Sequence, residues 1–199
     1  RTEHSMRLTS LAAPALALAL LADCSSPSAL PDATVTTPPI VDAEQLLTRH
    51  SLQGLTADQV VERLDSTEDD RAAGPVGSVR PRELLLSDSA GQARLALPAD
   101  RFYLSIAPYL TTTHDCFNHN LATCKGELAG KTVHVSVVDA AGATVLERDV
   151  TTYPNGFAGL WLPRDIKATL TVRYDALTAT TTIGTGDSDA TCLTTLRLQ

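Results

Sequence analysis

The residues best suited to chemistry in this 199-residue sequence gather in one short segment. Two cysteines, Cys116 and Cys124, alternate there with two histidines, His114 and His119, within eleven residues. Thiolate and imidazole groups are donors for copper or zinc, and the softness of sulfur favours Cu(I) on the thiolates, while the imidazoles can hold Cu(II) or Zn(II). We expect the segment to be a loop, because a regular strand would point alternate side chains to opposite faces.

A third cysteine, Cys192, lies 68 residues beyond Cys124 and opens the last predicted strand. It can complete a site of two or three thiolates, with one or both histidines as ligands or as their hydrogen-bonded neighbours. The alternative is a disulfide between Cys116 and Cys124 that staples their loop and leaves Cys192 alone. Spacing by itself favours neither. Three cysteines cannot all pair, however, and the interleaved histidines have no role in a staple, so we favour the metal site.

Other polar residues are assigned ordinary surface roles. His50 and His134 are expected to be solvated. Asp187 and Asp189 stand in a turn before Cys192, but a full set of ligands at calcium-loop spacing is missing. We interpret this segment as a solvated turn.

Composition and motifs exclude several classes of function. The net charge is −7 and no window holds a cluster of lysines and arginines, which excludes nucleic acid as a partner. No nucleophile elbow, phosphate-binding glycine loop or His-Glu-x-x-His helix occurs. We therefore expect a binding protein and not an enzyme, with no catalytic or organic-cofactor residues.

The beginning of the sequence has the features of an export signal. Met6-Arg7 precedes an apolar run at 8–21 that is too short to span a bilayer comfortably, so residues 1–23 are predicted to be a signal peptide. Leu-Ala-Asp-Cys, ending at Cys24, resembles the lipobox of bacterial lipoproteins, although Asp23 departs from the usual small residue. We predict acylation of Cys24, with plain secretion as the alternative, and a Ser/Thr/Pro-rich tether at 24–39. The expected location is the outer face of the cell membrane or the periplasm.

Residues 40–98 are predicted to form a small α/β domain. Asp42 can cap a first helix that Gly54 would end, and Thr56 can cap a second helix that stops near residues 65–66. A polar loop at 66–80 follows. The two strands of a hairpin are expected at 83–87 and 92–97.

Residues 99–199 are rich in strand-forming sequence. Val133, Val135 and Val137 alternate with polar residues, the period of a sheet with one solvated face, which points His134 outward. Short strands separated by turns indicate an antiparallel β-sandwich. Seven strands are expected, at 102–110, 131–139, 144–150, 156–162, 168–174, 178–182 and 192–198. The predicted fold class is α+β, a small N-terminal helix-plus-hairpin unit followed by the sandwich.

Four stretches carry a resemblance to a known family: Phe102-Tyr-Leu-Ser-Ile-Ala-Pro-Tyr109, residues 114–128, Asn155-Gly-Phe-Ala-Gly-Leu-Trp-Leu-Pro-Arg164 and Thr191-Cys-Leu-Thr-Thr-Leu196. Together they resemble the CueP family of periplasmic copper-binding proteins. The resemblance is strongest over 101–199 and extends more weakly through 55–86. Because several motifs match in order, it is specific.

The resemblance implies copper binding and copper resistance outside the cytoplasm, with Cys116, Cys124 and Cys192 as ligands. It also implies copper supply to an exported copper,zinc superoxide dismutase, reduction of Cu(II) at the thiols, and a homodimer formed through the first unit. Reduction is chemically sensible, because two thiolates donate two electrons when they form a disulfide. The disulfide would then be one state of the copper site.

Two other functions compete with copper sequestration and transfer. The first is a secreted, disulfide-braced β-sandwich module that binds a partner without metal. The second is a thiol oxidoreductase, which lacks a Cys-x-x-Cys pair at a helix start and is set aside.

Overall fold

The computed structural model describes residues 37–67 and 73–199. The predicted signal peptide, Cys24 and most of the predicted tether lie outside the described residues. None of the described helices is long and apolar enough to cross a membrane. The elements in chain order are α1 (Ala43–Arg49), α2 (Ala57–Asp65), β1 (Val76–Val79), β2 (Glu83–Asp88), β3 (Gly91–Ala96), β4 (Arg101–Ile106), β5 (His119–Asn120), β6 (Thr132–Asp139), β7 (Thr144–Thr151), β8 (Ala158–Pro163), β9 (Lys167–Tyr174), β10 (Leu177–Gly184) and β11 (Cys192–Leu193).

The two helices begin where their capping residues predict. The Asp42 side chain accepts the N–H of Gln45 at 2.9 Å, and the Thr56 N–H donates to the Gln59 side chain at 3.0 Å. The predicted end of α1 at Gly54 is wrong, since that helix stops at Arg49.

The early end of α1 follows from the burial of a leucine. Ser51 takes a positive φ of 57°, and the Leu52 N–H donates to the Leu47 carbonyl at 2.8 Å, which closes a Schellman motif. Leu47 and Leu52 are both buried. The chain therefore turns back to bury Leu52 before it reaches Gly54.

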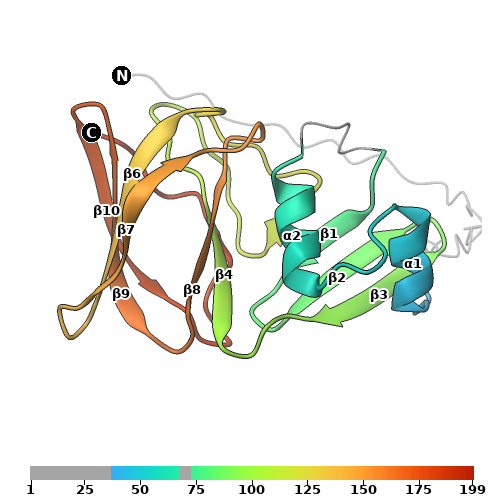
Figure 1. Ribbon diagram of the computed structural model, residues 1–199. Coiled ribbons are helices and arrows are strands. Elements are labelled where there is room, and N and C mark those ends of the chain that lie inside the picture. Colours follow the sequence, from blue (N-terminus) through green and yellow to red (C-terminus); the bar gives the residue numbers. More distant parts are fainter. Residues whose placement is uncertain (1–36, 68–72) are drawn as a thin grey trace, which may run out of the picture. The chain divides into compact units, whose positions relative to one another are not determined.

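The first sheet has the antiparallel strand order β3-β2-β1-β5 and packs against both helices (Figure 1). The predicted hairpin is confirmed as β2 and β3. Strands β1 and β5 are additional, because the sequence indicated a loop in both places. Buried residues of this first core include Leu46, Leu47, Val60, Val61, Val79, Leu84, Leu86, Tyr103 and Leu121.

Strand β5 docks on β1 because a glycine leaves room for it. The Leu121 N–H donates to the Gly77 carbonyl at 2.8 Å, and the Leu121 side chain occupies the space that a Cβ at residue 77 would need. The sequence of β5 has no strand pattern of its own. Its backbone is held in position by the pairing with β1.

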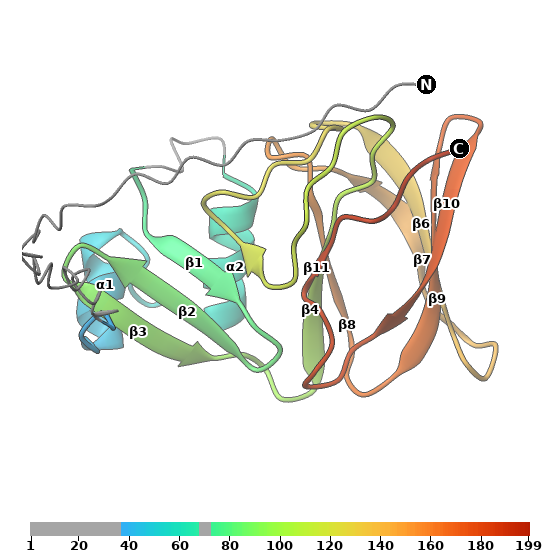
Figure 2. The same ribbon diagram turned by 180° about the vertical axis from the view of Figure 1, so that it is seen from behind.

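The remaining strands form two more sheets, β10-β9-β6-β7 and β11-β4-β8, that share a sandwich core. Val133, Val135 and Val137 are buried in it, and His134 points outward to Asp149 at 2.9 Å, as predicted. The α+β class is confirmed. One pair departs from the expected antiparallel pattern: β11 lies beside β4 and runs parallel to it (Figure 2). Only Cys192 and Leu193 of the predicted last strand form β11.

Strand β4 carries side chains of both cores on its opposite faces. Phe102 and Leu104 pack into the sandwich core, whereas Tyr103 packs into the first core beside Trp161 of β8, with ring centroids 4.8 Å apart. The β4-β8 sheet is therefore the layer at which the two cores meet, and the C-terminal end of α2 reaches it. A domain boundary between residues 98 and 99 stays a prediction.

The acidic turn before β11 is held by ion pairs. Asp187 lies 2.6 Å from both Arg82 and Arg164, and Asp189 lies 3.0 Å from Lys167. The carboxylates that resembled part of a calcium loop thus serve the turn that leads to Cys192.

Candidate metal centre

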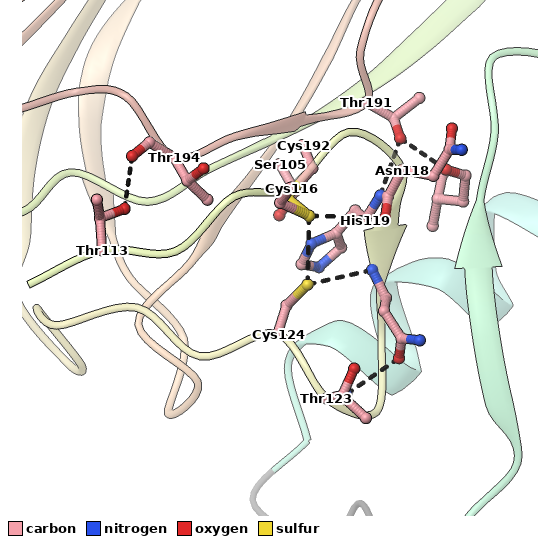
Figure 3. The surroundings of a disulfide bond; sticks show 12 residues. Ser105, Thr113, Cys116, Asn118, His119, Thr123, Cys124, Thr191, Cys192 and Thr194 are labelled. Atoms are coloured by element: carbon pink, nitrogen blue, oxygen red, sulfur yellow. Dashed lines mark hydrogen bonds between the residues drawn. A yellow bond between two sulfur atoms is a disulfide. The ribbon is translucent and has the colours of Figure 1, made fainter. Parts of the chain in front are cut away.

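The three cysteines of the described chain meet at one point, and we call them the sulfur cluster (Figure 3). Cys116 and Cys192 form a disulfide, and the Cys124 sulfur lies 3.5 Å from that of Cys116. Parallel pairing with β4 sets Cys192 opposite Ser105. The Phe117 carbonyl then accepts the Cys192 N–H at 3.1 Å, which fastens the start of β11 to the segment that bears Cys116.

The disulfide joins a different pair from the one considered from sequence. The Cys116–Cys124 disulfide considered from sequence is wrong for this structure. The hydrogen bond from the Cys192 N–H to the Phe117 carbonyl holds Cys192 beside Cys116, with their Cα atoms 5.6 Å apart. Cys124 is left as a buried thiol. The third sulfur does fold back onto the loop of the other two, as the metal-site prediction required.

The environment of Cys124 favours its thiolate. Burial by itself would raise the pKa of this thiol, but interactions with His119 and His114 and the N–H of Asn120, 3.4 Å from the sulfur, outweigh it. The resulting pKa is about 7, below the ordinary value of 9.0. A large part of Cys124 is therefore ionised at neutral pH, as metal binding requires.

His119 lies in the interior beside this thiol. It belongs to β5, where it pairs with Val79 of β1, and its ring packs on Phe157 with centroids 4.7 Å apart. Nε2 lies 2.9 Å from a carboxylate oxygen of Asp65. Burial would lower the pKa of His119, but interactions with Asp65 and Cys124 outweigh it and raise the pKa to about 9. Nδ1 lacks the geometry of a full hydrogen bond to any described group, so a metal ion that displaces the proton of this nitrogen can bind there.

Asp65 is a buried residue of the site that sequence reasoning missed. Its carboxylate accepts hydrogen bonds from Tyr103 at 2.6 Å, Asn155 at 2.7 Å and Ser105 at 3.3 Å, in addition to the contact with His119. Burial opposes ionisation, but these hydrogen bonds, that of His119 first, keep the pKa of Asp65 below its ordinary value. The carboxylate is therefore charged inside the protein.

A sequence signal for Asp65 did exist. Ala57, Val61 and Asp65 are spaced four residues apart on α2 and are all buried. An acidic residue on the apolar stripe of a helix has to find partners inside the protein. The helix pattern alone does not identify these partners, because they lie far from Asp65 in the sequence.

The candidate ligands form two overlapping groups that share Cys124. One comprises His114, Cys116 and Cys124, and the other His119, Cys124 and Cys192, with the candidate donor atoms of each group within 4.8 Å of one another. The structure thus brings all five predicted metal-site residues around the sulfur cluster. Once the disulfide is reduced, this donor set of thiolates and imidazoles suits Cu(I).

Glu127 holds the segment that leads to His114. Its carboxylate accepts N–H groups from Leu110 at 2.6 Å, Thr111 at 2.9 Å and Thr112 at 3.3 Å, and the Thr111 hydroxyl at 2.6 Å. The hydrogen bond from the Thr111 hydroxyl has the largest effect, and together with those from the N–H groups it lowers the pKa of Glu127 to about 2 from an ordinary 4.5.

We expect the chemical shifts of the Leu110 and Thr111 amide protons to change with a midpoint near pH 2 in NMR spectra, because both amides donate to the carboxylate of Glu127 and report its ionisation. A folded-state pKa below the unfolded one means that this contribution to stability is full above about pH 4.5 and is lost as pH falls through about 2. The Glu127→Gln variant should abolish the titration. A midpoint near pH 4.5 in the unaltered protein would contradict the prediction.

Comparisons with known proteins agree with the donor chemistry. A family model described as "Periplasmic copper-binding protein CueP" matches residues 59–197, a range that holds Asp65, both histidines and the sulfur cluster. A solved structure described as "Crystal Structure of S.CueP" is 42% identical, with a TM-score of 0.77 and a match covering 80% of this chain and 98% of that one. No curated protein matches the sequence.

Proposed function

This chain belongs to the CueP family of periplasmic copper-binding proteins, and we propose that it takes up copper at the sulfur cluster, with His114 and His119 as additional ligands. The observation that carries the proposal is the meeting of Cys116, Cys124 and Cys192 at one point, beside a buried imidazole nitrogen. Three soft donors in reach of one another favour Cu(I) over harder ions. Copper is here the cargo, and the fold supplies the ligands.

The reduced sulfur cluster also has the electrons to reduce Cu(II). We assign the donors as Cys116 and Cys192, an assignment supported by the disulfide between them. Two thiolates each give one electron to a Cu(II) ion, which yields two Cu(I) ions and one disulfide. Cys124 remains outside that disulfide, where it can hold one of the Cu(I) ions together with His119.

The test is an anaerobic reaction of the fully reduced protein with excess Cu(II), followed by a chromophoric Cu(I) chelator and peptide mapping. We expect about two Cu(I) ions per chain and a Cys116–Cys192 disulfide in the product, since the reaction moves two electrons. The Cys116→Ser/Cys192→Ser variant is the matched control and should lose the paired reduction. A product disulfide that contains Cys124, or no Cu(I) at all, would overturn the assignment.

The destination of the copper and the attachment of the protein are further parts of the proposal. The family resemblance supports transfer to an exported copper,zinc superoxide dismutase, which is checked by activation of the metal-free dismutase with the copper-loaded protein.

The lipobox-like sequence at Cys24 supports a lipid anchor, which is checked by comparing the mass of the protein isolated from membranes with that of its Cys24→Ser variant. A homodimer also stays a prediction.

The competing function is a disulfide-braced binding module without metal. The Cys116–Cys192 disulfide favours it, because a bond across 76 residues braces the loop against β11 whether or not copper binds. It leaves unexplained why Cys124 is buried against that disulfide and why a buried nitrogen of His119 points there. A reduced protein that binds no Cu(I) would decide for the module.

A further inference from the structure

A metal-binding histidine usually needs a second contact to fix its ring. Such a residue donates its other N–H to a carboxylate, a carbonyl or water, which sets the tautomer and raises the basicity of the ligand nitrogen. His119 has this arrangement, with Nε2 on Asp65 at 2.9 Å and Nδ1 left for an ion. Both side chains are fully buried.

We infer that Asp65 is the positioning residue of the copper site, holding His119 so that Nδ1 faces the sulfur cluster. The inference rests on the proposed copper function and extends it to a residue that touches no sulfur. Asp65 acts through His119 and is not itself a ligand.

The hydrogen bonds of Asp65 give its carboxylate one fixed orientation. Oδ2 accepts from Tyr103 and Ser105 of β4, while Oδ1 accepts from Asn155 and contacts His119. Both oxygens are thus engaged before any ion arrives, and the ring of His119 is packed on Phe157. The imidazole therefore has little freedom to swing Nδ1 away.

The negative charge of the Asp65 carboxylate is paired with the imidazole of His119. An uncompensated buried carboxylate is strongly unfavourable, so it has to be paired or hydrogen-bonded. Among its described hydrogen-bond and ion-pair partners, only His119 can carry a positive charge. A purely structural carboxylate would be satisfied by Tyr103 and Asn155 without a histidine directed at sulfur.

The placement of Asp65 also explains how the first core contributes to copper binding. Asp65 is the last residue of α2, and α2 packs by Val60 and Val61 into the first core. The helix therefore places the Asp65 carboxylate beside His119, which lies next to the sulfur cluster. On this view the first unit is a structural support of the copper site.

The test compares Cu(I) affinities of the reduced full chain by competition with a chromophoric chelator. Asp65→Asn should weaken binding about 10- to 100-fold, the loss typical when the partner of a metal-bound histidine is removed. In a His119→Gln background the same change should have no further effect, because Asp65 acts only through His119. Additive losses in the double variant would overturn the inference.

Two variants separate positioning from general stability. Asp88→Asn removes the matching carboxylate–histidine contact with His50, 3.1 Å at the β2–β3 hairpin, and should leave affinity unchanged. Tyr103→Phe removes one of the hydrogen bonds that orient Asp65 but leaves the His119 contact, so its affinity should fall less than that of Asp65→Asn.

A spectroscopic measurement on the unaltered protein keeps the inference testable if Asp65→Asn fails to fold. In ¹⁵N-histidine NMR spectra, the Nε2–H proton of His119 should persist on Cu(I) binding while the Nδ1 resonance shifts. Loss of that proton would overturn the inference. Unaltered protein that binds no Cu(I) would overturn the proposed function as well, whereas normal binding with an unchanged Asp65→Asn affinity would overturn this inference alone.

Discussion

Replacing Cys124 with serine is expected to weaken Cu(I) binding to the reduced protein by at least about 100-fold. Loss of even an indirect partner of a metal ligand costs up to roughly that factor, and Cys124 is proposed as a ligand itself. It is the one residue common to both donor groups, and a hydroxyl is a poor donor for a soft ion. Competition against a chromophoric Cu(I) chelator measures the loss.

Replacing Cys124 should disturb the fold of the oxidised protein less than replacing Cys116 or Cys192, because the Cys116–Cys192 disulfide is kept. A His134→Gln variant is the control, since His134 is an outward imidazole whose contacts are Glu147 and Asp149. That variant should bind Cu(I) normally. Normal binding by Cys124→Ser would remove the shared ligand and contradict the proposed site.

Reduction of the disulfide is expected to lower the free energy of unfolding of the metal-free protein by about 4 to 5 kcal/mol. The bond joins residues 76 apart, and the loss follows from the chain entropy that a loop of this size returns to the unfolded state. Guanidinium unfolding of the oxidised and the reduced protein, each with a metal chelator, gives the difference.

Copper should reverse part of that loss. A ligand that binds only the folded state stabilises it in proportion to the logarithm of its concentration over its dissociation constant, so Cu(I) added to the reduced protein should raise the unfolding midpoint. Without copper, the Cys116→Ser/Cys192→Ser variant should unfold like the reduced protein whether or not reductant is present, and Cu(I) should stabilise it less because two of the proposed ligands are missing. Equal midpoints for oxidised and reduced protein would contradict the prediction.

These two expectations describe one exchange at the sulfur cluster. Cys116 and Cys192 either brace the loop against β11 as a disulfide or remain thiolates that can bind copper. The oxidised protein should therefore be the more stable and the reduced protein the better Cu(I) ligand. Cys124, His119 and Asp65 keep their places in both states of this scheme.

Local signals in the sequence predicted much of the fold. Asp42 and Thr56 marked the helix starts because capping depends on residues three positions away, and the valines of β6 marked a sheet face because strand side chains alternate. Signals of this kind need only near neighbours in the chain. The end of α1 was mispredicted, because it depends on the burial of Leu52 and not on the glycine that follows.

The chemistry of the site was determined by the sequence, since three thiols and two nearby imidazoles define a soft donor set wherever the chain places them. Only the tertiary structure decided which sulfurs pair, that β5 docks on β1, and that Asp65 of α2 reaches His119. Each of these depends on contacts between residues far apart in the chain, such as Cys192 with Phe117 and Leu121 with Gly77. Such contacts form only when both cores are packed, so local spacing carries no record of them.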